Sequence, residues 1–301
     1  MSTGYDFLDA LRGQLTALPP AERGQTRRRR RLVTAAGAAA LAALAVVALL
    51  ARGGQDAVPP ANAAGFLADA ADRALAAPIG PLRPGEFYYE KVRGTNVGTD
   101  APGGIGTSEQ WTSRTSGRVL WGGYPRMTFR AVPGHPLATP FGSRVLTYAQ
   151  LLALPTDPER LARLIRNVSG PPGPVGPLVA RFRTIDQLLS QSPWPIPTPL
   201  RASILRVAAA IPGLTLNHAS VDCAGRRAVA VTQVSRSYGG NRNDLSLMRA
   251  EMLFDPATDA YLGDRETVVG HARPFECVAL LKTGVVNSDH IRPLDPPTPA
   301  R

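Results

Sequence analysis

The sequence is poor in cysteine, lysine and histidine. Its 301 residues include only two cysteines, two lysines and four histidines. Two cysteines are too few for a disulfide-rich scaffold or a zinc site built on thiolates. No two histidines lie within four residues of each other, so there is no local metal-binding pair. We therefore expect neither a metal nor another cofactor.

Local catalytic motifs are also missing. The sequence contains no Gly-x-Ser-x-Gly elbow, no Ser-x-x-Lys pair and no glycine-rich phosphate loop. Ser288, Asp289 and His290 are adjacent, whereas the members of a catalytic triad come from separate segments. We assign no catalytic residue and expect a protein that is not an enzyme. The alternative is an enzyme whose site is dispersed over the sequence.

Positive charge is abundant, with a formal net charge of +11. Residues 1–31 carry seven arginines against three acidic residues, which gives +4. Five of these arginines are consecutive: Arg27, Arg28, Arg29, Arg30 and Arg31. The other +7 is dispersed beyond residue 51 without a basic stripe. A 31-residue tail with one helix supplies no DNA-binding motif, so we expect no nucleic-acid partner.

An uncharged apolar run, LVTAAGAAALAALAVVALLA, covers residues 32–51. As a helix it spans roughly 30 Å, the thickness of a bilayer's hydrocarbon core. Because positive charge stays inside, Arg27 to Arg31 act as topology determinants that predict a cytoplasmic N-terminus and an extracytoplasmic C-terminal part at the plasma membrane. The alternative is a signal peptide cleaved after Ala63, although a leader of about 63 residues far exceeds the usual length.

The tail in front of this run has an amphipathic pattern. Within residues 5–18, apolar side chains recur every three or four positions, at Phe7, Leu8, Leu11, Leu15 and Leu18. Such a helix has no core of its own, so the segment is either a poorly ordered tail or a docking helix for a cytoplasmic regulator. We predict a cytoplasmic tail (1–31), a transmembrane helix (32–51), a linker (52–62), an extracytoplasmic domain (63–290) and a Pro-rich tail (291–301).

The extracytoplasmic part changes from strand to helix patterns and back. After a helix at 63–77, we predict strands at 86–93, 109–113, 118–122 and 127–132, and helices at 147–154, 158–168, 182–190 and 198–211. Five more strands follow at 213–222, 226–236, 247–254, 260–269 and 275–286. Asp157 and Thr198 are predicted as N-caps, each followed by proline, and residues 170–177 as a loop. This order favours an α+β domain, an antiparallel sheet with helices packed on one face.

Two residue types in this domain are candidate functional or structural features. Cys223 and Cys277 are predicted to form a disulfide in an oxidising compartment, the alternative being two unpaired buried thiols. Trp111, Trp121 and Trp194 are candidates to line an apolar cavity, the alternative being core packing.

The order of these features resembles an actinobacterial family of single-pass membrane proteins of unknown function, often encoded beside extracytoplasmic-function sigma factors. The resemblance is carried by the 32–51 span, EFYY (86–89), EQW (109–111), LLALPTDPER (151–160), AAIPG (209–213), DCAGR (222–226) and FDPATDAYLG (254–263). Asp259 stands where most such segments have glycine. The closing hairpin also resembles the half-barrel domains of lipoprotein carriers and sigma-regulator sensors, which hold an acyl chain or a peptide.

Together these features predict a bitopic membrane protein with a non-enzymatic extracytoplasmic binding or sensor domain. The resemblance implies a lipid or peptide ligand and regulation of a cytoplasmic partner, such as a sigma factor, through residues 5–18. The alternative is a membrane-anchored carrier of envelope lipids or lipoproteins, in which the tail serves only insertion.

Overall fold

The computed structural model describes residues 62–95, 104–121, 127–130, 137–169, 176–238, 245–271 and 273–294. The predicted helix at 5–18, the arginine block and the span at 32–51 lie outside these residues. Within the described ranges, none of the helices is both long enough and apolar enough to cross a membrane.

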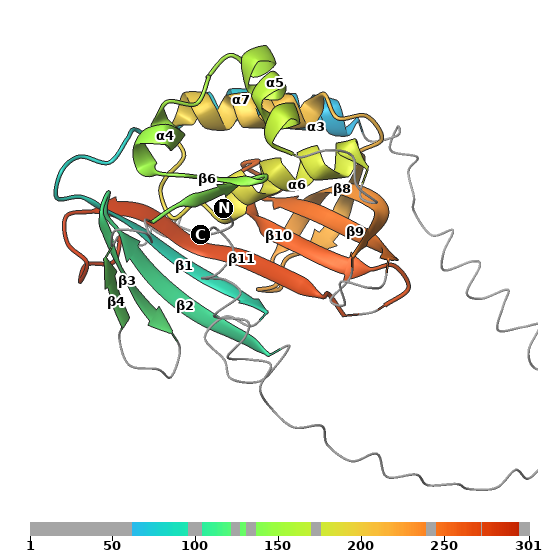
Figure 1. The fold of residues 1–301 in the computed structure, drawn as a ribbon. Helices are drawn as coiled ribbons and strands as arrows, with labels where there is room; N and C mark the ends of the chain where they lie inside the picture. Colours follow the sequence, from blue (N-terminus) through green and yellow to red (C-terminus); the bar gives the residue numbers. More distant parts are fainter. Residues whose placement is uncertain are drawn as a thin grey trace, which may run out of the picture. The chain divides into compact units, whose positions relative to one another are not determined.

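The described residues form one large sheet with the helices on one of its faces (Figure 1). The helices are α3 (Ala63–Ala76), α4 (Tyr148–Leu152), α5 (Pro158–Val168), α6 (Pro177–Ser190) and α7 (Thr198–Ala209). The first strands are β1 (Phe87–Thr95), β2 (Ile105–Thr112), β3 (Ser116–Trp121) and β4 (Met127–Arg130). The last are β7 (Thr215–Val221), β8 (Arg227–Tyr238), β9 (Leu245–Phe254), β10 (Tyr261–Val268) and β11 (Glu276–Val286). The α+β class with an antiparallel sheet and helices on one face is therefore confirmed.

The nine strands are ordered β4-β3-β2-β1-β11-β10-β9-β8-β7, and every neighbouring pair is antiparallel. The sheet thus consists of two meanders, one before the helices and one after them, joined where β1 pairs with β11. The predicted hairpin of Trp111 and Trp121 is the β2–β3 pair. A separate two-stranded hairpin, β5 (Thr139–Phe141) with β6 (Arg144–Leu146), was not predicted because each strand has only three residues.

The start of one helix, α5, agrees with the prediction, and the starts of α6 and α7 differ from it. Asp157 caps α5 as expected, with its carboxylate accepting from the Arg160 N–H at 2.8 Å. Thr198 does not cap α7, so that prediction was wrong: its hydroxyl instead accepts from the Ile79 N–H at 2.6 Å, and Pro197 occupies the cap position. Pro177, predicted as loop, is the first residue of α6, where its lack of an N–H costs nothing.

The main core lies between the helices and the sheet. It joins Leu67 of α3, Ile185 of α6 and Ile204 of α7 to Val231 and Met252 of the sheet, all of them fully buried. Burying such side chains contributes roughly 1.5–3 kcal/mol each and orients the helices on this face. The opposite, outer face of the sheet has smaller apolar clusters.

Candidate functional site

A cavity of about 260 Å³ lies where β10 separates from β11. Up to Ala279, β11 is paired with β10, but beyond it β11 continues with β1 as its partner. The separation begins at Gly263, whose φ of +133° and close approach to the Val278 carbonyl exclude a side chain. The cavity is lined by Tyr88, Glu90, Leu189, Ser192, Trp194, Ile196, Arg201, Arg226, Ala260, Tyr261, Leu262, Leu280, Leu281, Lys282 and Thr283.

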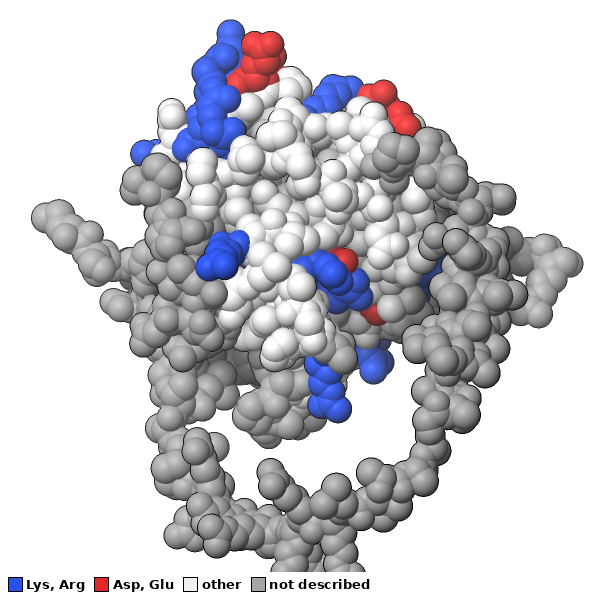
Figure 2. Space-filling view, turned by 90° about the vertical axis from the view of Figure 1, so that its right-hand side faces the viewer, with Lys and Arg blue, Asp and Glu red and all other residues white. Residues whose placement is uncertain are grey.

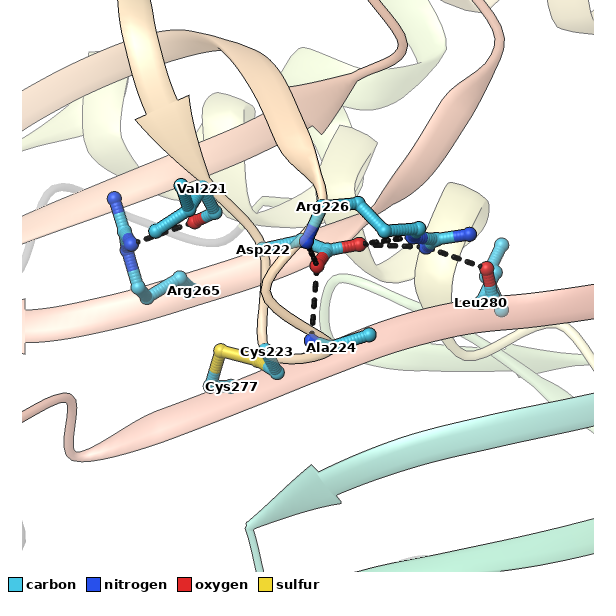
Figure 3. Close-up of polar contacts among 8 residues, drawn as sticks. All are labelled: Val221, Asp222, Cys223, Ala224, Arg226, Arg265, Cys277 and Leu280. Carbon is cyan, nitrogen blue, oxygen red and sulfur yellow. Dashed lines mark hydrogen bonds and ion pairs between the residues drawn. A yellow bond between two sulfur atoms is a disulfide. The ribbon is translucent and has the colours of Figure 1, made fainter.

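Arg226, at the tip of the β7–β8 hairpin, is one of the residues that line the cavity, and Figure 3 shows the contacts that hold this tip. The buried Asp222 carboxylate accepts hydrogen bonds from the N–H groups of Ala224 and Arg226 and from the Arg226 guanidinium, at 2.6–2.9 Å. Arg226 then donates to the Leu280 carbonyl of β11 at 2.7 Å, where β10 no longer covers that strand. Beside it, Cys223 and Cys277 form the predicted disulfide, with Cα atoms 6.0 Å apart. Two independent links therefore hold this hairpin on β11.

Two charged side chains that line the cavity have no ion pair within the described residues. Glu90 of β1 is half-buried on the helix-facing side, and burial raises its pKa to about 7. Arg201 lies in the first turn of α7, and its Nε atom is buried without a hydrogen-bond acceptor in the described part of the chain. Its positive charge acts on Tyr88, the buried neighbour of Glu90 on the same face. Perturbed ionisable groups in a cavity mark a candidate binding site.

A second polar cluster lies beneath α6, next to the cavity wall. Asp186 of α6 accepts a hydrogen bond from the Tyr261 hydroxyl at 3.2 Å, and Arg183 forms an ion pair with Glu266 at 3.1 Å. Burial, together with the Glu266 charge, raises the pKa of Asp186 to about 8. Burial also raises the pKa of Asp264 well above its usual range, with Asp186 adding to the shift. Burial therefore favours the protonated form of both aspartates, and with a pKa of about 8 Asp186 is mostly protonated at neutral pH.

Trp111 lies on the outer face of the sheet, away from the cavity. Its ring packs against Tyr89 with centroids 5.0 Å apart, and its Nε1 donates to the Ile291 carbonyl at 2.7 Å. Arg292 pairs with Glu109 at 2.6 Å and lies 5.9 Å from the Trp111 ring centroid. Residues 291 and 292, expected in a tail, thus cover this tryptophan.

We expect Arg292→Ala to lower the free energy of unfolding by about 0.5–1 kcal/mol, because it removes an exposed ion pair and a contact with the Trp111 ring. Urea unfolding followed by tryptophan fluorescence checks this, with a red shift of the folded-state emission as Trp111 gains water. The matched control is Arg144→Ala, at an exposed arginine of β6. Equal stability of both variants and the wild type would contradict this role of Arg292.

The structure separates the sequence-predicted site residues. Trp194 lies among the residues that line the cavity and donates from Nε1 to the Ser113 carbonyl at 2.8 Å. Trp111 lies on the other face of the sheet, 2% exposed. Trp121 belongs to β3, but its side chain lies outside the description. Arg27, Arg28, Arg29, Arg30 and Arg31 also lie outside the described residues.

Sequence reasoning did not identify Glu90, Arg201, Asp186 or Asp264. Glu90 interrupts the helix-facing positions of β1 between Tyr88 and Val92, and that interruption was the available indication. Asp264 has no such indication, because its neighbours in β10 are Gly263, Arg265 and, on the same face, Glu266. Arg201 follows Pro199 on a helix that is otherwise mostly apolar. Their proximity depends on the β1–β11 pairing, which joins residues nearly 200 positions apart and has no local sequence pattern.

Other surface features offer weaker sites. A depression between the start of α3 and the end of α7 has only Asn62 as a polar side chain in its lining. The face shown in Figure 2 carries mainly uncharged residues, and its lysines and arginines stand apart rather than forming a stripe. Among the described residues, no three His, Cys, Asp or Glu side chains are grouped so that they could hold a metal ion. The cavity beside Glu90 is therefore the best candidate site.

Comparison of the chain with protein-family models, with curated proteins and with solved structures gave no match. The site must therefore be interpreted from its own chemistry.

Proposed function

We propose that this chain is a membrane-anchored binding protein whose extracytoplasmic domain takes up a small ligand in the cavity between β1, β11 and α6. The observation that carries the proposal is a cavity of about 260 Å³ lined by the carboxyl group of Glu90, which has no ion pair within the described residues. A half-buried ionisable group without a partner costs stability, and such costs concentrate at functional sites.

Two features support the assigned location. The Cys223–Cys277 disulfide is typical of a protein outside the reducing cytoplasm. The arginine block before residues 32–51 favours a cytoplasmic N-terminus. Under this proposal, the 5–18 helix contacts a cytoplasmic regulator, such as a sigma factor or its inhibitor, and ligand binding outside alters that contact.

The lining of the cavity favours binding over catalysis. None of its residues is histidine or cysteine. Its serine, Ser192, is 3.1 Å from the Thr139 hydroxyl and donates to the Trp194 carbonyl at 2.9 Å. Thr283 lies opposite Glu90 in the β1–β11 ladder, but its hydroxyl is engaged in a hydrogen bond with Tyr88. Both hydroxyls are therefore already hydrogen-bonded, whereas covalent catalysis needs a nucleophile that is activated by an adjacent base. The lining is also too polar and the volume too small for the acyl chain that a lipid carrier would hold.

The test is native mass spectrometry of the full chain purified from membranes into nanodiscs. We expect a small bound molecule on the wild type and its loss in Leu189→Trp, which fills the cavity from α6. Leu152→Trp, at an exposed position of α4, is the control and should retain the molecule. No bound species on the wild type, or equal retention in both variants, would overturn the cavity as the binding site. A bound fatty acid that is displaced by Leu189→Trp would replace this proposal with the carrier function.

A further inference from the structure

We infer that the ligand is a small zwitterion of the amino-acid type, with its amine held by Glu90 and its acidic group held by Arg201. This inference rests on the proposed function and names the ligand class for the same cavity.

Glu90 provides the position for an amine. The packing of β1 under the helices buries its carboxyl group, and no cation within the described residues forms an ion pair with it. A ligand ammonium beside this carboxyl would restore the ionised form and replace the lost hydration with an ion pair. The aromatic side chains of Tyr88, Trp194 and Tyr261 line the same space and offer ring surfaces that also attract a cation.

Arg201 provides the position for an anion. Three other arginines near the cavity or α6 are engaged: Arg226 binds Asp222 and the Leu280 carbonyl, Arg183 pairs with Glu266, and Arg114 donates to the Leu82 carbonyl. Arg201 has no acceptor of this kind in the described structure, and its Nε is buried and unpartnered. A carboxylate or similar anion in the cavity would satisfy this guanidinium.

The two positions together define the ligand. An acyl chain would bury Glu90 and Arg201 without partners, and a simple amine or simple acid would satisfy one and leave the other. A zwitterion satisfies both. The cavity of about 260 Å³ has room for the volume of about nine water molecules at ~30 Å³ each, which suits a ligand of amino-acid size rather than a folded peptide.

The charged groups that line this cavity besides Glu90 come from three elements: Arg201 from α7, Arg226 from the β7–β8 hairpin and Lys282 from β11. Arg226 is engaged with Asp222, and Lys282 has its own interaction. Glu90 is therefore the group whose ionisation a ligand amine would change. Amine binding near pH 6.5 should release a proton from Glu90 to the buffer.

The experiment is isothermal titration calorimetry of the full chain in nanodiscs with L-leucine, leucine amide and N-acetyl-leucine. Leucine amide lacks the carboxylate and N-acetyl-leucine lacks the ammonium, so each should bind at least roughly tenfold more weakly than leucine, the equivalent of one lost charged contact. The dipeptide Gly-Leu distinguishes a free amino acid from a peptide end as the source of the zwitterion. The leucine enthalpy at pH 6.5 should differ between phosphate and Tris, reporting the released proton.

Variants assign the two ends of the ligand. Glu90→Gln should abolish the buffer dependence and remove the advantage of leucine over N-acetyl-leucine, and Arg201→Gln should remove its advantage over leucine amide. Arg93→Gln, at an exposed arginine of β1, is the control and should behave as wild type. The comparison of leucine with its two blocked forms uses only the wild-type protein. It therefore tests the zwitterion even if one of the variants does not fold.

Equal binding of leucine and its two blocked forms, or no binding of any of them, would overturn the zwitterion. If native mass spectrometry still finds a cavity-bound molecule in that case, the proposed binding function stands with another ligand class. Leucine binding that persists in Leu189→Trp would place the site elsewhere and overturn both.

Discussion

Removing the disulfide with Cys223→Ser and Cys277→Ala together is expected to lower the free energy of unfolding by about 4 kcal/mol. The bond closes a loop of 54 residues, and releasing that loop restores entropy to the unfolded chain. Alanine is chosen at Cys277 because this residue is 3% exposed and a buried hydroxyl would add a cost of its own. Urea unfolding of the full chain, followed by circular dichroism, measures the change.

The loss should exceed the effect of the other link between the β7–β8 hairpin and β11. Arg226→Ala removes the hydrogen bond to the Leu280 carbonyl but leaves the covalent bond in place. Dithiothreitol supplies the matched control: it should destabilise the wild type to about the level of the double variant and leave the double variant unchanged. A wild type that is equally stable with and without the reductant would show that the bond does not constrain the folded domain.

Asp186→Asn is expected to flatten the dependence of stability on pH. The pKa of Asp186 is about 8 in the folded protein and about 3.9 in an unfolded chain. Between these values the folded state holds a proton that the unfolded state has released, so stability falls as pH rises. The slope for this group is ~1.4 kcal/mol per pH unit, or about 2 kcal/mol between pH 6 and 7.5.

Asparagine keeps the oxygen that accepts from the Tyr261 hydroxyl and has no proton to lose in this range. The free energy of unfolding of the variant, measured by urea unfolding at each pH, should therefore increase relative to that of the wild type as the pH rises from 5 to 7.5. The charged groups facing Asp186 are Glu266, Glu276 and Arg183, with Asp264 buried beside them. Asp69→Asn, on the exposed side of α3, is the control, and its stability should depend on pH in the same way as that of the wild type. A constant difference between Asp186→Asn and the wild type would contradict a protonated Asp186.

Local sequence patterns predicted most elements because their causes are local. Asp157 before Pro158 marked the start of α5, and alternation with turn residues marked the five strands from β7 to β11. The misplaced ends have tertiary causes. Thr198 failed as a cap because the chain after α3 brings the Ile79 N–H within reach of its hydroxyl, and that contact joins residues 119 positions apart.

The candidate site was hardly predictable. Trp194 was named among the cavity candidates, but the sequence near Glu90 or Arg201 contains no motif that indicates a binding or catalytic site. Glu90 looks like an ordinary polar position of a half-exposed strand until α6 and α7 cover that face. The same holds for Asp264, whose burial depends on the β-bulge at Tyr261 and Gly263.

By itself, the sequence determined the order of the elements other than the short β5–β6 hairpin, the α+β class, the apolar run behind five arginines and the candidate cysteine pair. These follow from periodicity, composition and charge, which act between near neighbours or need no geometry at all. Only the tertiary structure decided that β1 pairs with β11, that Arg226 reaches the open edge of β11, and that Glu90 and Arg201 line one cavity. The physical reason is that burial and pairing of these side chains depend on segments distant in the chain, which no local pattern records.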